Sequence, residues 1–236
     1  MISINPKKLA LAVLLLFLAT TSPSYAELRT NMSADVVVGQ ADFISRTANP
    51  GGVGANTLQS VGRVFSDGTH LFIADYNNNR VLIYNSIPTS NNASADVVVG
   101  QPDFTSNSFN QTGSLTVAGA NTLLAPRSVF SDGKHLFIAD TTNNRVLIYN
   151  SIPTYNNASA DIVIGQPDFT SNSINQTGST ALAGANTLSA PRSVSSDGKR
   201  LFIADAVNSR VLIYNIDSLP AMQLGPQFEQ GKAVLG

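Results

Sequence analysis

A segment of 15 residues occurs three times in this chain with little change, and this repetition constrains the fold more than any other feature. It reads LFIADYNNNRVLIYN at 71–85, LFIADTTNNRVLIYN at 136–150 and LFIADAVNSRVLIYN at 201–215, at intervals of 65 residues. A second motif, SADVVVGQADF, begins at 33 and returns with small changes at 94 and 159. Self-similarity at a fixed period is typical of repeat architectures. We therefore expect three repeat units, over about 33–93, 94–158 and 159–236.

Each unit contains four short apolar segments typical of β-strands. For the second unit they lie at 129–131, 136–139, 146–149 and, at the start of the following repeat, 161–165; the Asp-Gly pair at 132–133 favours a hairpin turn between the first two. The segments are unbroken apolar runs, which indicates burial on both faces. Four antiparallel strands stacked between neighbouring sheets predict an all-β fold, namely a β-propeller with four-stranded blades. A β-solenoid is the alternative, although its repeats are shorter.

Composition excludes several classes of protein. The chain has 236 residues, no Cys, 14 basic and 15 acidic residues, and a net charge of −1. This balance argues against nucleic-acid binding, and the lack of Cys excludes disulfides and thiolate-bound metals. The two histidines, His70 and His135, share one repeat position that is Arg200 in the third unit, which indicates a solvated turn. We expect no metal and no cofactor.

The N-terminal segment is typical of a secretory signal peptide. Lys7 and Lys8 precede the apolar run LALAVLLLFLA (9–19), and Ser24-Tyr25-Ala26 supplies small residues at a cleavage site before Glu27. The run is too short to cross a hydrocarbon core of about 30 Å as a helix. We therefore expect a signal peptide over 1–26 and an exported protein, periplasmic or extracellular, with no membrane span after cleavage. An uncleaved anchor is the alternative.

The segment SVFSDGKHLFIADTTNNRVLIYN (128–150) resembles an NHL repeat, which is a β-propeller blade unit. The matching features are the Asp-Gly turn, the apolar strand ending in Ala-Asp, Asn143 and Arg145. The GQPDF motif followed by a long connector resembles a bacterial subgroup of exported NHL proteins. NHL propellers include protein-binding, RNA-binding, sensor and enzyme domains, so the resemblance implies a fold more than a function. The first unit departs from the pattern, because Val61-Gly62-Arg63 stands where the others have Pro-Arg-Ser.

An Asp–Asn–Arg set recurs at the second hairpin of every unit. An Asp that ends one strand and an Arg that opens the next favour a charge-assisted contact across the turn. Because the set occurs in every unit, we expect a structural role; a ring that binds an anion or a carbohydrate is the alternative. The sets are Asp75, Asn78 and Arg80; Asp140, Asn143 and Arg145; and Asp205, Asn208 and Arg210.

The connectors 105–125 and 170–190 are uncharged, rich in hydrogen-bonding side chains, and longer than most loops. In a propeller they share one face with the second hairpin turns. We predict that this face binds a protein, peptide or glycan; alternatively, the connectors only cover it, anchored by Leu123 and Leu188. Calcium binding by the aspartates of the GQPDF motifs is less favoured than turn capping, because no calcium-loop spacing is present. The candidate binding residues are Gln101, Asp103, Asn110, Asn121, Gln166, Asp168, Asn175 and Asn186.

The sequence shows no pattern of a catalytic site. NHL-like lyases and lactonases place His, Glu or Asp ligands around a central channel, but after the signal peptide this chain has only Glu27 and Glu229 as glutamates. We therefore expect a non-enzymatic binding module. The alternatives are a small-substrate enzyme of the lyase or lactonase type and a fragment without independent activity.

Three units are fewer than the four to eight blades or so of closed propellers, and NHL propellers resemble the six-bladed kind. Residues 35–39 predict an outer strand without a blade of its own, and the segment 233–236 resembles another strand that stops before its QPDF. The apolar runs 71–74 and 201–204 would then lie bare at the two ends of an open arc. We expect either a homodimer that completes a six-bladed ring through strand 35–39, or aggregation.

Overall fold

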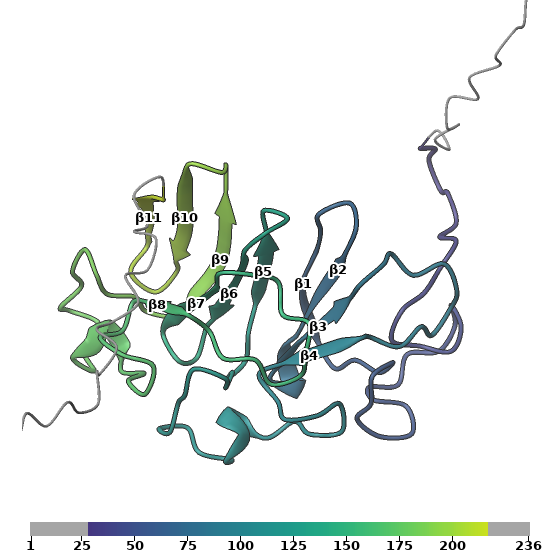
Figure 1. Ribbon diagram of the computed structural model, residues 1–236, viewed down its shortest axis with the longest axis horizontal. Coiled ribbons are helices and arrows are strands. Elements are labelled where there is room, and N and C mark those ends of the chain that lie inside the picture. Colours follow the sequence, from purple (N-terminus) through teal and green to yellow (C-terminus); the bar gives the residue numbers. More distant parts are fainter. Residues whose placement is uncertain (1–27, 217–236) are drawn as a thin grey trace, which may run out of the picture. The chain divides into compact units, whose positions relative to one another are not determined.

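The computed structural model describes residues 28–216, and within them the protein is all-β (Figure 1). The signal peptide expected at 1–26 and the strand expected at 233–236 lie outside the described residues. Contacts divide the chain into two units, with the boundary between Ala34 and Asp35. The described part of the first unit, 28–34, is exposed. No helix in the described part of the chain is long and apolar enough to cross a membrane.

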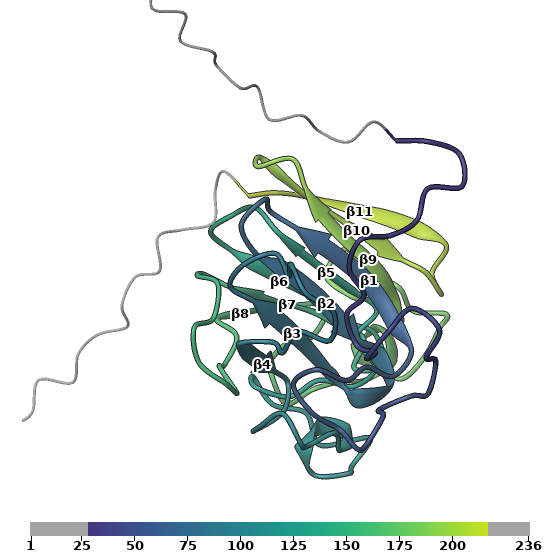
Figure 2. The same cartoon turned by 90° about the vertical axis from the view of Figure 1, so that its right-hand side faces the viewer.

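Three antiparallel sheets form the second unit, and in each sheet every strand pairs with the next one along the chain. The first sheet contains β1 (Val61–Ser66), β2 (Leu71–Asp75), β3 (Arg80–Tyr84) and β4 (Val97–Val99). The second contains β5 (Ser128–Ser131), β6 (Leu136–Asp140), β7 (Arg145–Tyr149) and β8 (Ile162–Ile164). The third contains β9 (Pro191–Ser196), β10 (Arg200–Asp205) and β11 (Arg210–Asn215). In Figure 2 the strands of the three sheets run along one common diagonal.

The sheets repeat one register, so each is a copy of the same local design. In the first sheet Asp75 pairs with Arg80, and Val81 pairs with Val99; the second sheet has the same pairs 65 residues later. The fourth strand of each complete sheet therefore comes from the following repeat unit. Three single-turn 3-10 helices accompany the sheets, at Tyr76–Asn78, Phe109–Gln111 and Ile174–Gln176.

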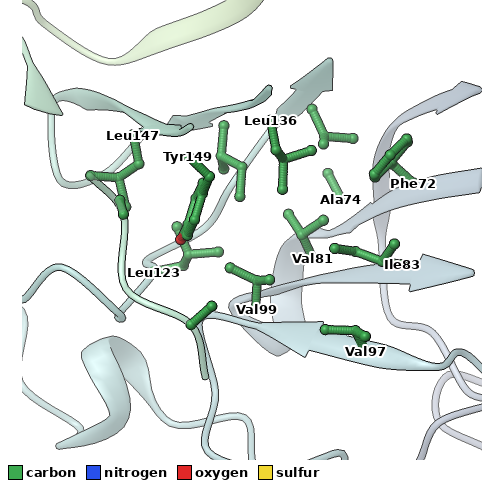
Figure 3. Packing of buried hydrophobic residues seen from close by; sticks show 14 residues of the cluster. Phe72, Ala74, Val81, Ile83, Val97, Val99, Leu123, Leu136, Leu147 and Tyr149 are labelled. Atoms are coloured by element: carbon green, nitrogen blue, oxygen red, sulfur yellow. The ribbon is translucent and has the colours of Figure 1, made fainter. Parts of the chain in front are cut away.

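Successive side chains along a strand point to opposite faces of the sheet, and because the strands are continuous apolar runs, both faces of every sheet are apolar. Neighbouring sheets pack against each other through these faces. We call one the front face and the other the back face. The front face of the first sheet packs against the back face of the second (Figure 3), and the front face of the second packs against the back face of the third. The front faces consist of Phe72, Ala74, Val81 and Ile83; Phe137, Ala139, Val146 and Ile148; and Phe202, Ala204, Val211 and Ile213. The back faces consist of Leu71, Ile73, Leu82 and Tyr84; Leu136, Ile138, Leu147 and Tyr149; and Leu201, Ile203, Leu212 and Tyr214.

The first strands of adjacent sheets approach one another closely, and this explains the departure at Val61-Gly62-Arg63. The Arg63 N–H donates a hydrogen bond of 3.0 Å to the carbonyl of Arg127 on the neighbouring sheet. A Cβ at Gly62 would lie 2.7 Å from that carbonyl oxygen, closer than any side chain tolerates. Glycine at this position is therefore required by the distance between β1 and β5.

The strand expected at 35–39 does not form as a regular strand. Its central residue, Val37, instead bonds to a loop: its N–H donates to Oδ1 of Asn91 at 3.0 Å, and its carbonyl accepts from the Asn92 N–H at 2.9 Å. A strand forms by pairing with a neighbouring strand, and residues 35–39 do not pair with an edge strand of any of the three described sheets.

Candidate functional site

The long connectors and the second hairpin turns lie on one side of the sheets, which we call the connector face. Nδ2 of Asn79, in the turn between β2 and β3, donates to the Asn107 carbonyl in the first connector at 3.0 Å. The side chains of Asn110 and Asn143 also bond to each other, at 2.7 and 3.1 Å. The first hairpin turns lie at the other end of the strands, at the top of Figure 1.

The Asp–Asn–Arg sets of the first and second sheets are enclosed in the protein, whereas in the third sheet Asp205 is buried but the Arg210 side chain is 27% exposed. In the second sheet Asp140 and Arg145 are fully buried and form an ion pair of 2.8 Å. The other oxygen of Asp140 accepts the Leu124 N–H, and Arg145 Nη2 donates to the carbonyls of Gly119 and Thr122. The pair therefore ties the hairpin to the end of the connector, and no part of it reaches solvent.

The other two sheets repeat this arrangement. Arg80 pairs with Asp75 and Arg210 pairs with Asp205, both at 2.8 Å. In all three sheets the Asn of the set donates to the same carboxylate at 2.8 Å; these residues are Asn78, Asn143 and Asn208. The expected structural role accounts for every one of these contacts.

Four of the eight candidate binding residues lie inside the protein. Gln101 is buried, and its Nε2 donates to the carbonyls of Asn79 and Ser108. Asn110 is also buried, and its Nδ2 donates to the Ser114 carbonyl. Gln166 and Asn175 repeat these bonds in the second connector. These residues hold the connectors in place, and of the four Gln166 also lines a pocket, with Gln176, Asn186 and Tyr214.

Asp103 and Asp168 are exposed, and both cap turns. Oδ1 of Asp103 accepts the N–H groups of Thr105 and Ser106 as well as both hydroxyls. These hydrogen bonds, that of the Thr105 hydroxyl foremost, lower the pKa of Asp103 below its ordinary value. Asp168 makes the equivalent contacts with Thr170 and Ser171, and its pKa is lowered for the same reason.

The remaining two candidates lie nearer the surface of the connectors. Asn121 is half-buried, and its Nδ2 donates to Oδ1 of Asn157 at 3.2 Å. Asn186 is exposed, and its carbonyl accepts Nε2 of Gln176. Leu123 and Leu188 are fully buried and anchor the two connectors. The connectors are therefore ordered covers of this face, with few polar side chains left for a ligand.

A group of three arginines, which sequence reasoning missed, lies at the starts of the first strands. We call Arg63, Arg127 and Arg192 the arginine group. Nη1 of Arg63 donates to the Val194 carbonyl at 3.2 Å and lies 3.4 Å from Oγ of Ser193, next to Arg192. The Arg63 guanidinium also lies over the Phe65 ring, 5.9 Å from its centroid. The backbones of Arg63 and Arg127 are thus bonded directly, and the Arg63 side chain reaches the strand that contains Arg192.

The arginine group has no counter-charge in the described part of the chain, where none of its members forms an ion pair with a carboxylate. The Arg127 guanidinium stacks on Tyr76, 4.5 Å from the ring centroid, and donates to the Tyr76 hydroxyl at 3.2 Å. Tyr76 belongs to the turn between β2 and β3, so this contact places Arg127 at the connector face. Arg192 is exposed.

No family model matches the sequence, and no curated protein matches it. Among residues 28–216, no three His, Asp or Glu side chains are close enough together to hold a metal ion. The histidines belong to the first hairpin turns, where Nδ1 of His70 and of His135 pairs with Asp67 and Asp132. The connector face therefore offers hydrogen-bonding groups and the positive charge of Arg127.

Each repeat unit has an arginine near the start of its first strand, but these arginines do not all align when the repeats are compared. Arg127 and Arg192 share one repeat position, which is Gly62 in the first unit, while Arg63 lies one residue later. Position-by-position comparison therefore does not group the three. The offset between β1 and β5, fixed by the hydrogen bond from the Arg63 N–H to the Arg127 carbonyl, brings Arg63 beside Arg127.

Proposed function

We propose that the protein is an exported, non-enzymatic β-propeller segment of the NHL type, and that its connector face binds a peptide segment rich in carboxylates. The repeated register, the face-to-face packing of successive sheets and the first strands lying side by side support the propeller. The signal-peptide pattern supports export, and on this account the exported protein begins at Glu27, which N-terminal sequencing would show.

The observation that carries the proposed ligand is the arginine group. Guanidinium groups present planar pairs of donors that fit carboxylates, and three of them with no ion-pair partner among residues 28–216 favour an anion. The connectors 105–125 and 170–190 on the connector face are uncharged, so a peptide bound beside Arg127 would meet little negative charge there beyond the capping residues Asp42, Asp103 and Asp168. A partner with several acidic side chains therefore fits better than a neutral or basic one.

The test is binding of a fluorescently labelled, glutamate-rich peptide, measured by anisotropy at low ionic strength. Replacing Arg127 and Arg192 by Gln removes two charge-assisted contacts and should weaken binding by roughly tenfold or more. The matched control, Lys134→Gln with Lys199→Gln, removes the same charge from the first hairpin turns and should leave binding unchanged. Equal loss in both variants, or no binding by the unaltered protein, would contradict the proposal; retained binding of an acidic glycan alone would reassign the ligand.

A further inference from the structure

The outward faces of the first and third sheets are the two halves of an interface that the chain already makes twice. The front face of the third sheet has no sheet on it among residues 28–216, and Val211 and Ile213 there are 62% and 60% exposed. The same positions in the first and second sheets are fully buried against a back face: Val81, Ile83, Val146 and Ile148.

On the back face of the first sheet, Ile73, Leu82 and Tyr84 are already buried by residues of the same chain, among them Val38 and Leu58, so the expectation that the run 71–74 lies bare is wrong. The opening on this face is at β1, where Val64 is 57% exposed, whereas Val129 and Val194 at the same position in the other sheets are fully buried.

Each contact between neighbouring sheets also includes one turn residue that is held by two hydrogen bonds; we call the groups that donate these bonds the receptor of the turn. Asn79 has a left-handed backbone, and its Oδ1 accepts the Ala125 N–H of the next sheet at 2.9 Å while its carbonyl accepts Nε2 of Gln101. Asn144 makes the equivalent bonds to Ala190 and Gln166 in the following sheet.

The corresponding receptor of the first sheet is open. Gln40 and Ser60 stand where Gln101 and Ala125 stand in the next unit, and they line a cavity of about 380 Å³ with Val38 and Leu58. The corresponding turn residue of the third sheet is Ser209, which is exposed and has the same left-handed backbone as Asn79, with φ of 52° against 53°. The hydroxyl oxygen of Ser209 can accept the Ser60 N–H, as Oδ1 of Asn79 accepts the Ala125 N–H. Its carbonyl can accept Nε2 of Gln40, as the Asn79 carbonyl accepts Nε2 of Gln101.

Residues 36–38 lack only a strand to pair with. In the complete first sheet, Val98 bonds outward to Asn156 and Asn157, while its neighbours Val97 and Val99 pair with Ile83 and Val81 of β3. Val37 makes the same outward bonds to Asn91 and Asn92.

The backbone of residues 36–38 makes no hydrogen bond on the side that faces away from Asn91 and Asn92 within residues 28–216. Within 28–216 the backbone groups of Val36 and Val38 have no hydrogen-bonding partner. The outer edge of β11 has no strand beside it in the same range. The sequence at 36–38, Val-Val-Val, is that of β4.

We propose that a second copy of this chain completes both ends. The front face of the third sheet of one copy packs on the back face of the first sheet of the other, Ser209 enters the cavity beside Gln40, and residues 36–38 become the fourth strand beside β11. The register of β3 with β4 then pairs Leu212 of one copy with Val37 of the other. Two such contacts close six sheets, because each copy offers one of each end.

The absence of Cys makes this register testable by an introduced disulfide. Val37 directs its backbone groups away from β11, so Val37 and Leu212 form a non-hydrogen-bonded pair, with Cα atoms about 4.5 Å apart, which a disulfide can span. Oxidation of the Val37→Cys, Leu212→Cys variant should give a covalent dimer on a non-reducing gel. The control, Val36→Cys with Leu212→Cys, places the thiols on opposite faces and should give none.

Equal cross-linking of the two variants, a ladder of larger species, or no cross-linking by a folded variant whose thiols react freely would overturn the proposal. The last result is also expected if residues 233–236 of the same chain occupy the edge of β11. A second measurement does not depend on the cysteine variants folding. Val211→Glu with Ile213→Glu alters exposed side chains only and should halve the mass measured by light scattering, whereas Leu115→Glu with Leu182→Glu, equally exposed on the connectors, should leave it unchanged; equal masses for both would contradict the proposal.

Discussion

Two kinds of aspartate stabilise this protein. One kind is buried with an arginine and receives hydrogen bonds from a connector, as Asp140 does. The other kind is exposed and caps a turn, as Asp103 does. The two kinds differ in how much the protein loses when the carboxylate is removed, because only the first leaves a charge uncompensated in the interior.

Replacing Asp140 by Ala should lower the free energy of unfolding by about 3–5 kcal/mol, since Arg145 would remain buried without its partner. Denaturant unfolding measures the change. Lys134→Ala, at an exposed position in a first hairpin turn, serves as the control and should change stability by less than about 0.5 kcal/mol. If Asp140→Ala kept its unfolding midpoint but lost peptide binding, the structural role of the set would be refuted.

The capping aspartates predict the response to acid. Hydrogen bonds from the Lys199 N–H and then the Arg200 side chain lower the pKa of Asp197 to about 2, and the pKa values of Asp103 and Asp168 are also lowered. A carboxyl whose pKa is lower in the folded state stabilises it above the unfolded pKa, about 3.9. This stabilisation should fade as the pH falls from about 4 toward 2. Urea unfolding across that interval measures it, Asp197→Asn should flatten the slope, and stability that rises on acidification would contradict the assignment.

At the scale of strands and turns, the repeats predicted most of what the structure shows. The strands expected for the second unit are confirmed as β5 to β8, and each strand begins and ends within one residue of its expected position. Short unbroken apolar runs between turn signals are compatible with few structures other than buried strands. Residues 35–39 carry the same signal yet form no regular strand, since pairing depends on a neighbour that local sequence does not specify. Gln101 and Asn110 looked available for a ligand because a polar residue in a loop gives no sign of whether its partners lie inside the protein.

The contact between β1 and β5 predicts a specific sensitivity at Gly62. Ala at this position places a methyl group against the Arg127 carbonyl and should destabilise the protein by about 1–3 kcal/mol through overpacking. Gly184→Ala is the control, because a Cβ there meets nothing closer than 3.4 Å. Thermal unfolding of the two variants compares them, and equal melting temperatures would mean that the first strands can separate without loss.

At the scale of the whole molecule, each of the three sheets packs only against its neighbours, as in repeat proteins. The stability of such a protein is approximately the sum of the stabilities of its repeats and of the interfaces between neighbours. The chain makes this interface twice. Among the described residues no sheet covers the front face of the third sheet, and on the back face of the first sheet, which is otherwise covered by residues of the same chain, Val64 is exposed. Apolar surface of that kind is where proteins associate.

The most direct test is the mass of the unaltered chain in solution. Size-exclusion chromatography with light scattering at micromolar concentration should give twice the mass of one chain, with no larger species growing in over time. A stable, soluble monomer at that concentration would show that the outward faces of the first and third sheets need no partner, and would contradict the account.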